Sequence, residues 1–480
     1  MLFNSIHYLI FFPIVAGAYF ILPQRYRWML VLASSYYFYM CWRVEYVFLI
    51  VISTLVDYWA GLYIGSHHHS GKRKAALFLS LFCNLGLLFV FKYLDFFGHS
   101  LNMVSGSFNI FFHMPDLKFL LPVGISFYTF QSLSYTIDIY NNKRKPERHL
   151  GIFASYVAFF PQLVAGPIER STHLIPQFFI KHRFDYARVT SGLKLMAWGF
   201  FKKLVIADRL AIYVNQVFNN PYEYQGQAVL LAVYFFAFQI YCDFSGYTDI
   251  AIGSARVMGF ELMKNFNCPY YAKSISDFWR RWHISLSSWF RDYLYIPLGG
   301  NRVGRGRWYF NLMIVFCLSG LWHGANWTFA LWGALHGFYF IFGDLSCGFR
   351  RKLAQKVGLA RFPRLYGFLQ TCTTFHLVCF GWIFFRANSV KEALVLLRNL
   401  FRFDLGGLNI NVALGREGLI VAIVSIGLLE LVHGLQQRYG LSALLGRQHG
   451  VVRWAAYYLL LMTVLLFGQF GSQEFIYFRF

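Results

Sequence analysis

Charged side chains are scarce in this sequence of 480 residues. They make up 14% of it, whereas hydrophobic residues make up 57% and aromatic residues 21%, and a soluble domain usually carries about 25% charged residues. Several apolar runs approach the length of about 20 residues that a helix needs to cross a bilayer. These runs are residues 46–64, 75–91, 227–241, 419–435 and 454–470. The composition excludes an ordinary soluble protein and predicts an all-α, polytopic membrane protein, with one integral membrane domain over residues 1–480.

Acidic residues are also few, 21 against 44 lysines and arginines, which gives a formal net charge of +23. The basic residues fall in short loops between apolar runs, as the positive-inside rule requires. We therefore expect membrane lipids, and no nucleic acid, as partners. The eight cysteines show no CxxC pairing, and the sequence contains no Walker loop, GxSxG or HExxH motif. These absences predict no resident metal or cofactor.

The basic loops predict the orientation of the chain in its membrane. Loops around residues 72–74, 143–148, 350–364 and 438–453 are rich in lysine and arginine, whereas residues 98–116 and 215–227 contain none. Placing the basic loops in the cytoplasm leaves both termini outside and requires an odd number of crossings, for which we expect about eleven. The short apolar stretch 151–166 fits none of them and predicts a re-entrant or interfacial piece.

His323 stands between long apolar runs, and no lysine or arginine occurs between Arg307 and Arg350. An ionisable group in such a setting indicates a functional site, and histidine moves protons near neutral pH. An even number of crossings between the two arginines predicts a bend at residues 320–326. Gly320 and Gly324 would allow close backbone contact there. For His336, thirteen residues further on, we expect a packing role.

Residues 277–293 show the periodicity of an amphipathic helix that lies in the membrane interface. Ser274 is the expected helix start, and His283 falls on the border between the apolar and polar faces. The polar face suits either the phosphates of a cytoplasmic ligand or anionic lipid headgroups. The candidate donor-binding residues are Arg280, Arg281, Arg291 and Asn301.

A third group of polar residues, 243–249 (DFSGYTD), follows the apolar run that begins near residue 227. Carboxylates beside a membrane span need partners or water. They either line a cavity or pair with arginine. We expect Asp243, Trp322 and Asn326 to line the cavity around His323.

Motifs over nearly the whole chain resemble those of the membrane-bound O-acyltransferase family, in its bacterial branch that acetylates alginate and peptidoglycan. They are residues 1–5 (MLFNS), 122–131 (PVGISFYTFQ), 161–168 (PQLVAGPI), 243–247 (DFSGY), 278–287 (FWRRWHISLS), 295–301 (YIPLGGN) and 321–324 (LWHG). The resemblance implies that His323 is catalytic and that His283 is a second functional position. It also implies a helical bundle around a funnel in a bacterial inner membrane.

The same resemblance implies an acyl donor, usually acetyl coenzyme A, that enters from the cytoplasm as a substrate. It further implies an extracytoplasmic partner of the SGNH-esterase type and a polysaccharide acceptor such as alginate, cellulose or peptidoglycan. Tyr477 could receive the acyl group before the partner does, or it could be an interfacial anchor. Two other functions stay open: proton-coupled transport of a polysaccharide or lipid, and D-alanyl transfer to teichoic acid.

Overall fold

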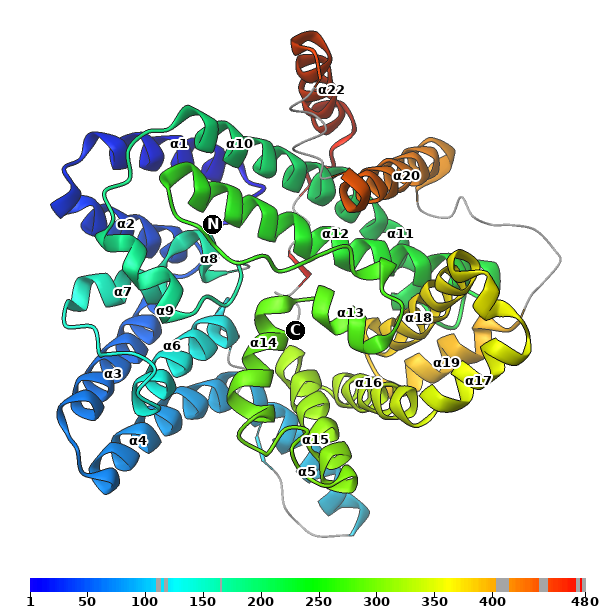
Figure 1. Ribbon diagram of the computed structural model, residues 1–480, viewed down its shortest axis with the longest axis horizontal. Helices are drawn as coiled ribbons and strands as arrows, with labels where there is room; N and C mark the ends of the chain where they lie inside the picture. Colours follow the sequence, from blue (N-terminus) through cyan, green and yellow to red (C-terminus); the bar gives the residue numbers. More distant parts are fainter. Residues whose placement is uncertain are drawn as a thin grey trace. The chain divides into compact units, whose positions relative to one another are not determined.

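The computed structural model describes residues 1–108, 114–115, 120–164, 166–402, 414–439, 448–471 and 475–476. Within these ranges every regular element is a helix (Figure 1). The chain divides into two compact units, of which unit 1 comprises Met1–Leu193 with Ala251–Met263, and unit 2 comprises Lys194–Ile250 with Lys264–Phe480. The all-α fold is confirmed. The single domain over the whole chain stays a prediction.

Unit 1 is built mainly from short and medium helices. Its α-helices are α1 (Ile6–Ile21), α2 (Gln24–Met40), α3 (Val47–Ser66), α4 (Ser70–Leu88), α5 (Leu94–Ser107), α6 (Ile125–Tyr140), α7 (Leu150–Ala158), α8 (Phe160–Leu163) and α9 (Ser171–Leu174), joined by η1 (Val44–Tyr46), η2 (Phe89–Tyr93) and η3 (Ile175–Phe179). The stretch expected to be re-entrant is the broken pair α7 and α8, which is short, apolar and almost entirely buried. Irregular backbone of this kind is tolerated at membrane depth when protein surrounds it.

A buried carboxylate joins three helices of unit 1. Asp57 of α3 is fully buried and accepts hydrogen bonds from the Ser80 hydroxyl at 2.5 Å and the Asn84 amide at 2.9 Å, both on α4. The Thr136 hydroxyl of α6 donates to the same carboxylate at 3.4 Å. Because lipid offers no hydrogen bonds, such side chains fasten helices to one another only when they are paired.

Unit 2 contains the residues that the sequence marks as functional. Two helices, α10 (Tyr186–Phe200) and α12 (Gln227–Met258), have residues in both units. The others are η4 (Phe201–Ala207), α11 (Asp208–Asn219), η5 (Pro269–Tyr271), α13 (Ile275–Arg281), α14 (Ile284–Phe290), η6 (Arg291–Tyr295), α15 (Arg305–His323), α16 (Trp327–Leu345), α17 (Cys347–Lys356), η7 (Leu359–Arg361), α18 (Pro363–Arg386), α19 (Val390–Leu400), α20 (Gly415–Tyr439) and α22 (Gly450–Phe467).

Helices α15 and α16 pack closely against each other (Figure 1). A Cβ atom on Gly320 of α15 would lie 2.2 Å from the carbonyl oxygen of Phe329, and one on Gly333 of α16 would lie 2.3 Å from that of Phe316. Glycine is therefore required at both positions, since real Cβ atoms do not approach other atoms so closely. The later residue of α15, Gly320, faces the earlier part of α16 at Phe329, and the earlier residue Phe316 faces Gly333. The two helices are therefore antiparallel.

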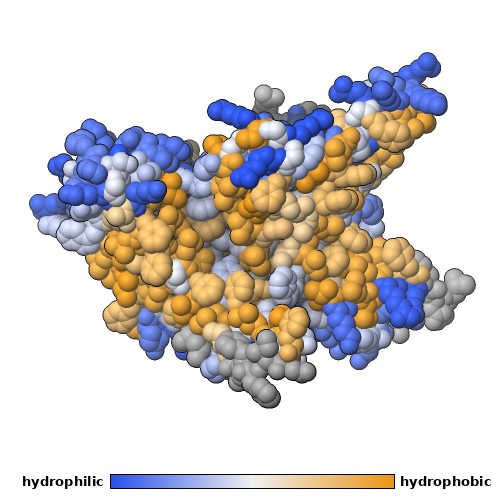
Figure 2. Space-filling view, turned by 90° about the horizontal axis from the view of Figure 1, so that it is seen from below, coloured by the Kyte–Doolittle hydropathy of each residue, from blue (hydrophilic) through white to orange (hydrophobic). Residues whose placement is uncertain are grey.

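Many large hydrophobic side chains of the described residues are exposed. Figure 2 shows them over most of the visible face, with hydrophilic side chains gathered toward its margins. Six helical stretches among the described residues are long and apolar enough to cross a membrane: Val44–Ser66, Ser70–Ser107, Gln227–Met258, Pro363–Arg386, Gly415–Arg438 and Gly450–Phe467. The protein is therefore a multi-pass membrane protein. The expected total of about eleven crossings stays a prediction.

Candidate functional site

His323 is the last residue of α15, and only 2% of its surface is exposed. Residues 324–326 form the bend that the sequence predicts, and α16 begins at Trp327. A Cβ atom on Gly324 would lie 2.1 Å from the Phe329 ring, so only glycine fits beside His323. Asn326 caps α16 by accepting a hydrogen bond from the Thr328 backbone N–H at 3.0 Å.

His283 does not lie within one continuous helix, so the expected amphipathic helix over residues 277–293 is wrong. Instead α13 ends at Arg281 and α14 begins at Ile284. His283 lies between them with φ at 42°, in the left-handed region. This conformation costs a residue with a Cβ atom about 1–2 kcal/mol. Only the expected helix start is confirmed, since the Ser274 hydroxyl accepts from the Asp277 N–H at 3.1 Å.

The strained turn at His283 is held by a neighbouring segment of the chain. The carbonyl oxygen of Asn265 accepts a hydrogen bond from Ile284 N–H at 2.9 Å, and its side-chain oxygen accepts from Ser285 N–H at 3.2 Å. The His283 Nδ1 atom itself caps α14 by accepting from Leu286 N–H at 3.4 Å. Unusual backbone persists where surrounding contacts determine it, and it is common at functional sites.

The two histidines come together although they are 40 positions apart in the sequence. Their ring centroids lie 6.4 Å apart, with the rings inclined at 65°. Trp322 contacts both, with ring centroids 5.9 Å from His283 and 5.0 Å from His323. Trp322 is buried between the two histidines. Its expected place in the lining of a cavity stays a prediction.

Aromatic rings surround this histidine pair. Trp332 and Phe385 lie against His323 at centroid distances of 5.2 Å and 5.3 Å, and Phe244 lies 4.7 Å from His283. Burial in these surroundings disfavours the charged imidazole and lowers the pKa of His283 to about 3. His283 is therefore neutral at physiological pH, and because its Nδ1 accepts from Leu286 N–H, the ring proton lies on Nε2, which is a hydrogen-bond donor.

Asp243 forms a buried ion pair, and its partner is a lysine rather than an arginine. Lys203 Nζ lies 2.6 Å from Asp243 Oδ1 and 2.8 Å from Asp208 Oδ1. All three side chains are buried. Lys203 was not among the residues predicted from the sequence. The signal was the presence of two lysines within the apolar run 195–206, because cations at such positions need partners.

A segment near the end of the sequence reaches the same cluster. Ile476 donates its backbone N–H to Asp243 Oδ2 at 2.8 Å, and both Phe475 and Ile476 are buried. The Phe475 ring lies 4.5 Å from Tyr247 and 5.7 Å from Phe244. Tyr477, the candidate acyl relay, lies outside the described residues.

The candidate donor-binding residues lie toward solvent. Arg280, Arg291 and Asn301 are exposed. Arg281 Nε pairs with Asp277 Oδ1 at 2.9 Å, and Arg291 Nε pairs with Asp292 Oδ1 at 2.8 Å. Asn326 uses its side chain to cap α16 and to donate to the Asn388 carbonyl at 3.0 Å, so it fixes the bend beside His323.

His336, for which packing was expected, is buried on α16. Its Nδ1 atom accepts a hydrogen bond from Trp279 Nε1 at 3.3 Å, and its ring lies 5.0 Å from Trp332. Trp332 therefore separates His336 from His323 within one aromatic cluster.

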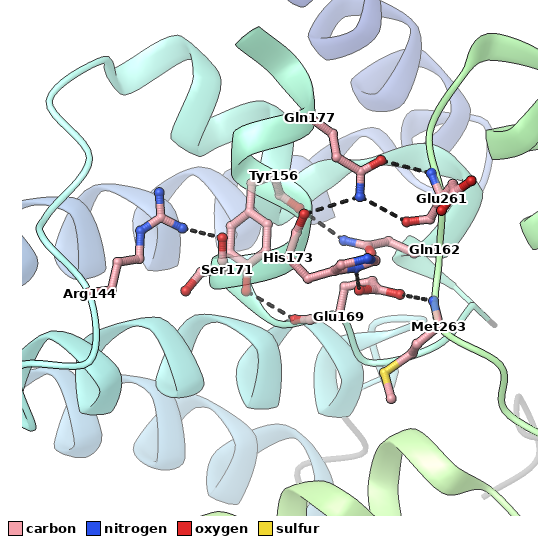
Figure 3. A network of polar contacts seen from close by, with 9 residues as sticks. All are labelled: Arg144, Tyr156, Gln162, Glu169, Ser171, His173, Gln177, Glu261 and Met263. Carbon is pink, nitrogen blue, oxygen red and sulfur yellow. Dashed lines mark hydrogen bonds and ion pairs between the residues drawn. The ribbon is translucent and has the colours of Figure 1, made fainter. Parts of the chain in front are cut away.

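Unit 1 contains a polar network that was not predicted from the sequence (Figure 3). The buried Glu169 carboxylate pairs with His173 Nδ1 at 2.9 Å and accepts the Met263 N–H. Gln177 adds hydrogen bonds to both backbone groups of Glu261, at 2.9 Å and 2.7 Å. The hydrogen bond to Glu169 raises the pKa of His173. A carboxylate directly after the apolar motif 161–168 was the available signal.

Comparison with known proteins places these residues in a family. The model of the membrane-bound O-acyltransferase family matches residues 33–382. The probable alginate O-acetylase AlgI of Pseudomonas aeruginosa is 40% identical over 448 residues, which are 92% of this chain and 82% of that protein. The peptidoglycan O-acetyltransferase of Helicobacter pylori is 36% identical over 435 residues, 83% and 80% of the two chains.

A more distant similarity links the chain to a different acyl transfer. The teichoic acid D-alanyltransferase of Bacillus subtilis is 29% identical over 287 residues, which are 57% of this chain and 70% of that protein. The family match includes the turn at His283 and the end of α15 at His323. The chain therefore belongs to the membrane-bound O-acyltransferase family and is an acyltransferase.

Proposed function

We propose that this protein takes an acetyl group from acetyl coenzyme A at the cytoplasmic face and passes it across the membrane for O-acetylation of an extracytoplasmic polysaccharide. The observation that carries the proposal is the pair His283 and His323, whose ring centroids are 6.4 Å apart in buried, aromatic surroundings. The names of the AlgI and peptidoglycan relatives support an acetyl group and a polysaccharide such as alginate or peptidoglycan. Cellulose is a further candidate acceptor.

In the proposed reaction His323 acts as general base. It removes the proton from an acceptor hydroxyl, whose oxygen attacks the thioester carbonyl carbon. The new ester C–O bond forms as the C–S bond breaks, and the proton on His323 passes to the departing thiolate. His283, neutral and adjacent, orients His323 or relays its proton. The aromatic surroundings exclude the water that would otherwise hydrolyse the thioester.

The acyl group then has to leave the site on the extracytoplasmic side. We propose the bacterial inner membrane as the location, with both termini outside, because the basic loops favour the cytoplasm. Tyr477 would accept the acetyl group and transfer it to a partner of the SGNH-esterase type, which selects the polysaccharide. The donor's phosphates would meet Arg280, Arg281, Arg291 and Asn301, which are accessible to solvent wholly or in part.

Acetyl transfer by the purified protein, reconstituted with radiolabelled acetyl coenzyme A, tests the proposal. His323→Ala should reduce transfer by about 100- to 10,000-fold, the usual contribution of a general base. His336→Gln is the matched control, because it removes another buried histidine of the same aromatic cluster. Near-wild-type transfer by folded His323→Ala protein would sink the assignment.

The same assay separates the alternatives. The name of the Bacillus subtilis relative supports a second function, the transfer of D-alanine to teichoic acid. In that function a carrier protein would replace coenzyme A as donor. Labelled D-alanyl transfer without acetyl transfer would establish it. A transporter would move its substrate without consuming either donor.

A further inference from the structure

The chain near its last described residues is fastened to η4 and α12 at two points. Gln469 donates its N–H to the Leu204 carbonyl at 2.9 Å, directly after α22. Leu204 belongs to the π-helix η4, and a π-turn disturbs the regular pairing of backbone carbonyls. The second point is the hydrogen bond from Ile476 N–H to Asp243 at 2.8 Å. We call Phe475 and Ile476 the tail segment.

The charges beneath the tail segment favour this contact. Lys203 faces two carboxylates, so the group Lys203, Asp208 and Asp243 has one formal positive and two formal negative charges. Lys203 occupies Oδ1 of Asp243, and the tail segment occupies Oδ2. A hydrogen bond to an ionised acceptor is roughly twice as strong as one between neutral groups, and here both Asp243 and Ile476 are buried.

The tail segment also lies close to the histidine pair, because Phe244 contacts both Phe475 and His283. Phe475 is fully buried against Phe244 and Tyr247, and Phe244 also contacts His283, at a centroid distance of 4.7 Å. The hydrogen bond and the ring contact together fix one backbone nitrogen and one side chain of the tail segment. A merely anchoring tail would need neither a buried ion pair nor a place beside His283.

We infer that Asp243, held by Lys203, is a positioning residue that docks the tail segment beside His283, where the proposed acyl transfer takes place. The inference rests on the proposed function for its catalytic consequence. The docking itself does not depend on that function. In this inference the histidines carry out the chemistry, and Asp243 of the DFSGY motif binds the tail segment.

Digestion of the full-length protein in detergent by carboxypeptidase, followed by intact mass measurement, tests the docking. In the wild-type chain digestion should stop before it removes Ile476. In Asp243→Asn, which has lost the charge of the acceptor, digestion should pass Ile476 about 10- to 100-fold faster, as expected for the loss of a hydrogen bond to a charged group. Asp249→Asn is the matched control. Asp249 lies on α12, as Asp243 does, and its carboxylate pairs with Lys202 at 2.7 Å but makes no hydrogen bond to the tail segment.

Kinetics test the positioning role. Asp243→Asn should lower kcat for acetyl transfer about tenfold or more while the KM for acetyl coenzyme A stays unchanged, and Asp249→Asn should change neither. Equal digestion of the two variants would overturn the docking. Faster digestion of Asp243→Asn with unchanged kcat would overturn the positioning role. Because His323→Ala should lose transfer while its tail stays protected, failure of the proposed function is distinguishable from failure of the docking.

If Asp243→Asn does not fold, hydrogen exchange on the wild-type protein tests the docking of the tail segment instead. The Ile476 amide should exchange at least 100-fold more slowly than in a free peptide of residues 473–480, because its hydrogen bond and its burial both protect it. Exchange at the rate of the free peptide would overturn the docking without any substitution.

Discussion

Replacing Gly320 with alanine tests whether the close packing of α15 and α16 sets the position of His323. The new methyl group would lie 2.2 Å from the carbonyl oxygen of Phe329. Since real Cβ atoms stay at least 3.0 Å from such atoms, the helices must separate by about 0.8 Å at this level, the difference between the two distances. The atoms nearest to the new methyl group belong to the backbone of α16, so no flexible side chain can move aside to relieve the clash.

Separation at Gly320 acts on stability and on activity. Overpacking of this kind costs about 1–3 kcal/mol in free energy of unfolding. His323 follows Gly320 by less than one helical turn, so the same movement displaces its ring from His283. A displacement near 1 Å can reduce a catalysed rate by about 100-fold. We therefore expect a folded but less stable protein with strongly reduced acetyl transfer.

Thermal unfolding followed by tryptophan fluorescence, together with the acetyl-transfer assay, measures both effects. Gly306→Ala is the control on the same helix, because a Cβ atom there meets no atom within 4 Å. Alanine at such a helical position stabilises by up to about 1 kcal/mol. The reasoning is refuted if Gly320→Ala unfolds and transfers like the wild type, or if Gly306→Ala is equally damaging.

Three further substitutions test other parts of the structure. Asp57→Leu should lower the thermal unfolding temperature, because it leaves the buried Ser80 hydroxyl and its neighbours without their acceptor, each at a cost of about 1–3 kcal/mol; an unchanged midpoint would contradict this. His283→Gly should lower the unfolding midpoint and abolish acetyl transfer, because the relief of about 1–2 kcal/mol of backbone strain is outweighed by about 2–5 kcal/mol for the cavity left by the buried ring; transfer retained by the glycine variant would show that the imidazole is dispensable. Because Glu169 raises the pKa of His173, this pair should stabilise unit 1 fully below the unfolded-state pKa of about 6.5 and lose that effect as the pH rises through the folded-state pKa. Unfolding midpoints between pH 5 and pH 9 should show this dependence in the wild type and a smaller one in His173→Gln.

Local sequence signals predicted several elements because their causes are local. The start of α13 at Ser274 is a capping interaction that needs only a hydroxyl three residues before an N–H group. The bend after His323 followed from charge spacing, since no basic residue occurs between Arg307 and Arg350. The broken apolar stretch 151–166 was visible as too short to cross a membrane.

The turn at His283 could not be predicted from periodicity. Apolar residues continue at helical spacing through residues 277–293, and no proline or glycine interrupts them. The helix breaks because Asn265, 18 positions earlier, accepts the N–H groups of Ile284 and Ser285. A long-range hydrogen bond of this kind leaves no mark on the local pattern.

By itself, the sequence determined that the protein is a multi-pass helical membrane protein, and its motifs indicated the family and the two histidines. Composition and charge spacing decide these properties, because a bilayer selects for apolar length and for the position of cations. Only the tertiary structure decided that His283 and His323 lie 6.4 Å apart and that Asp243 holds Lys203 and the tail segment. These arrangements depend on contacts between distant segments, whose free energy comes from burying paired polar groups where neither water nor lipid can replace the partner.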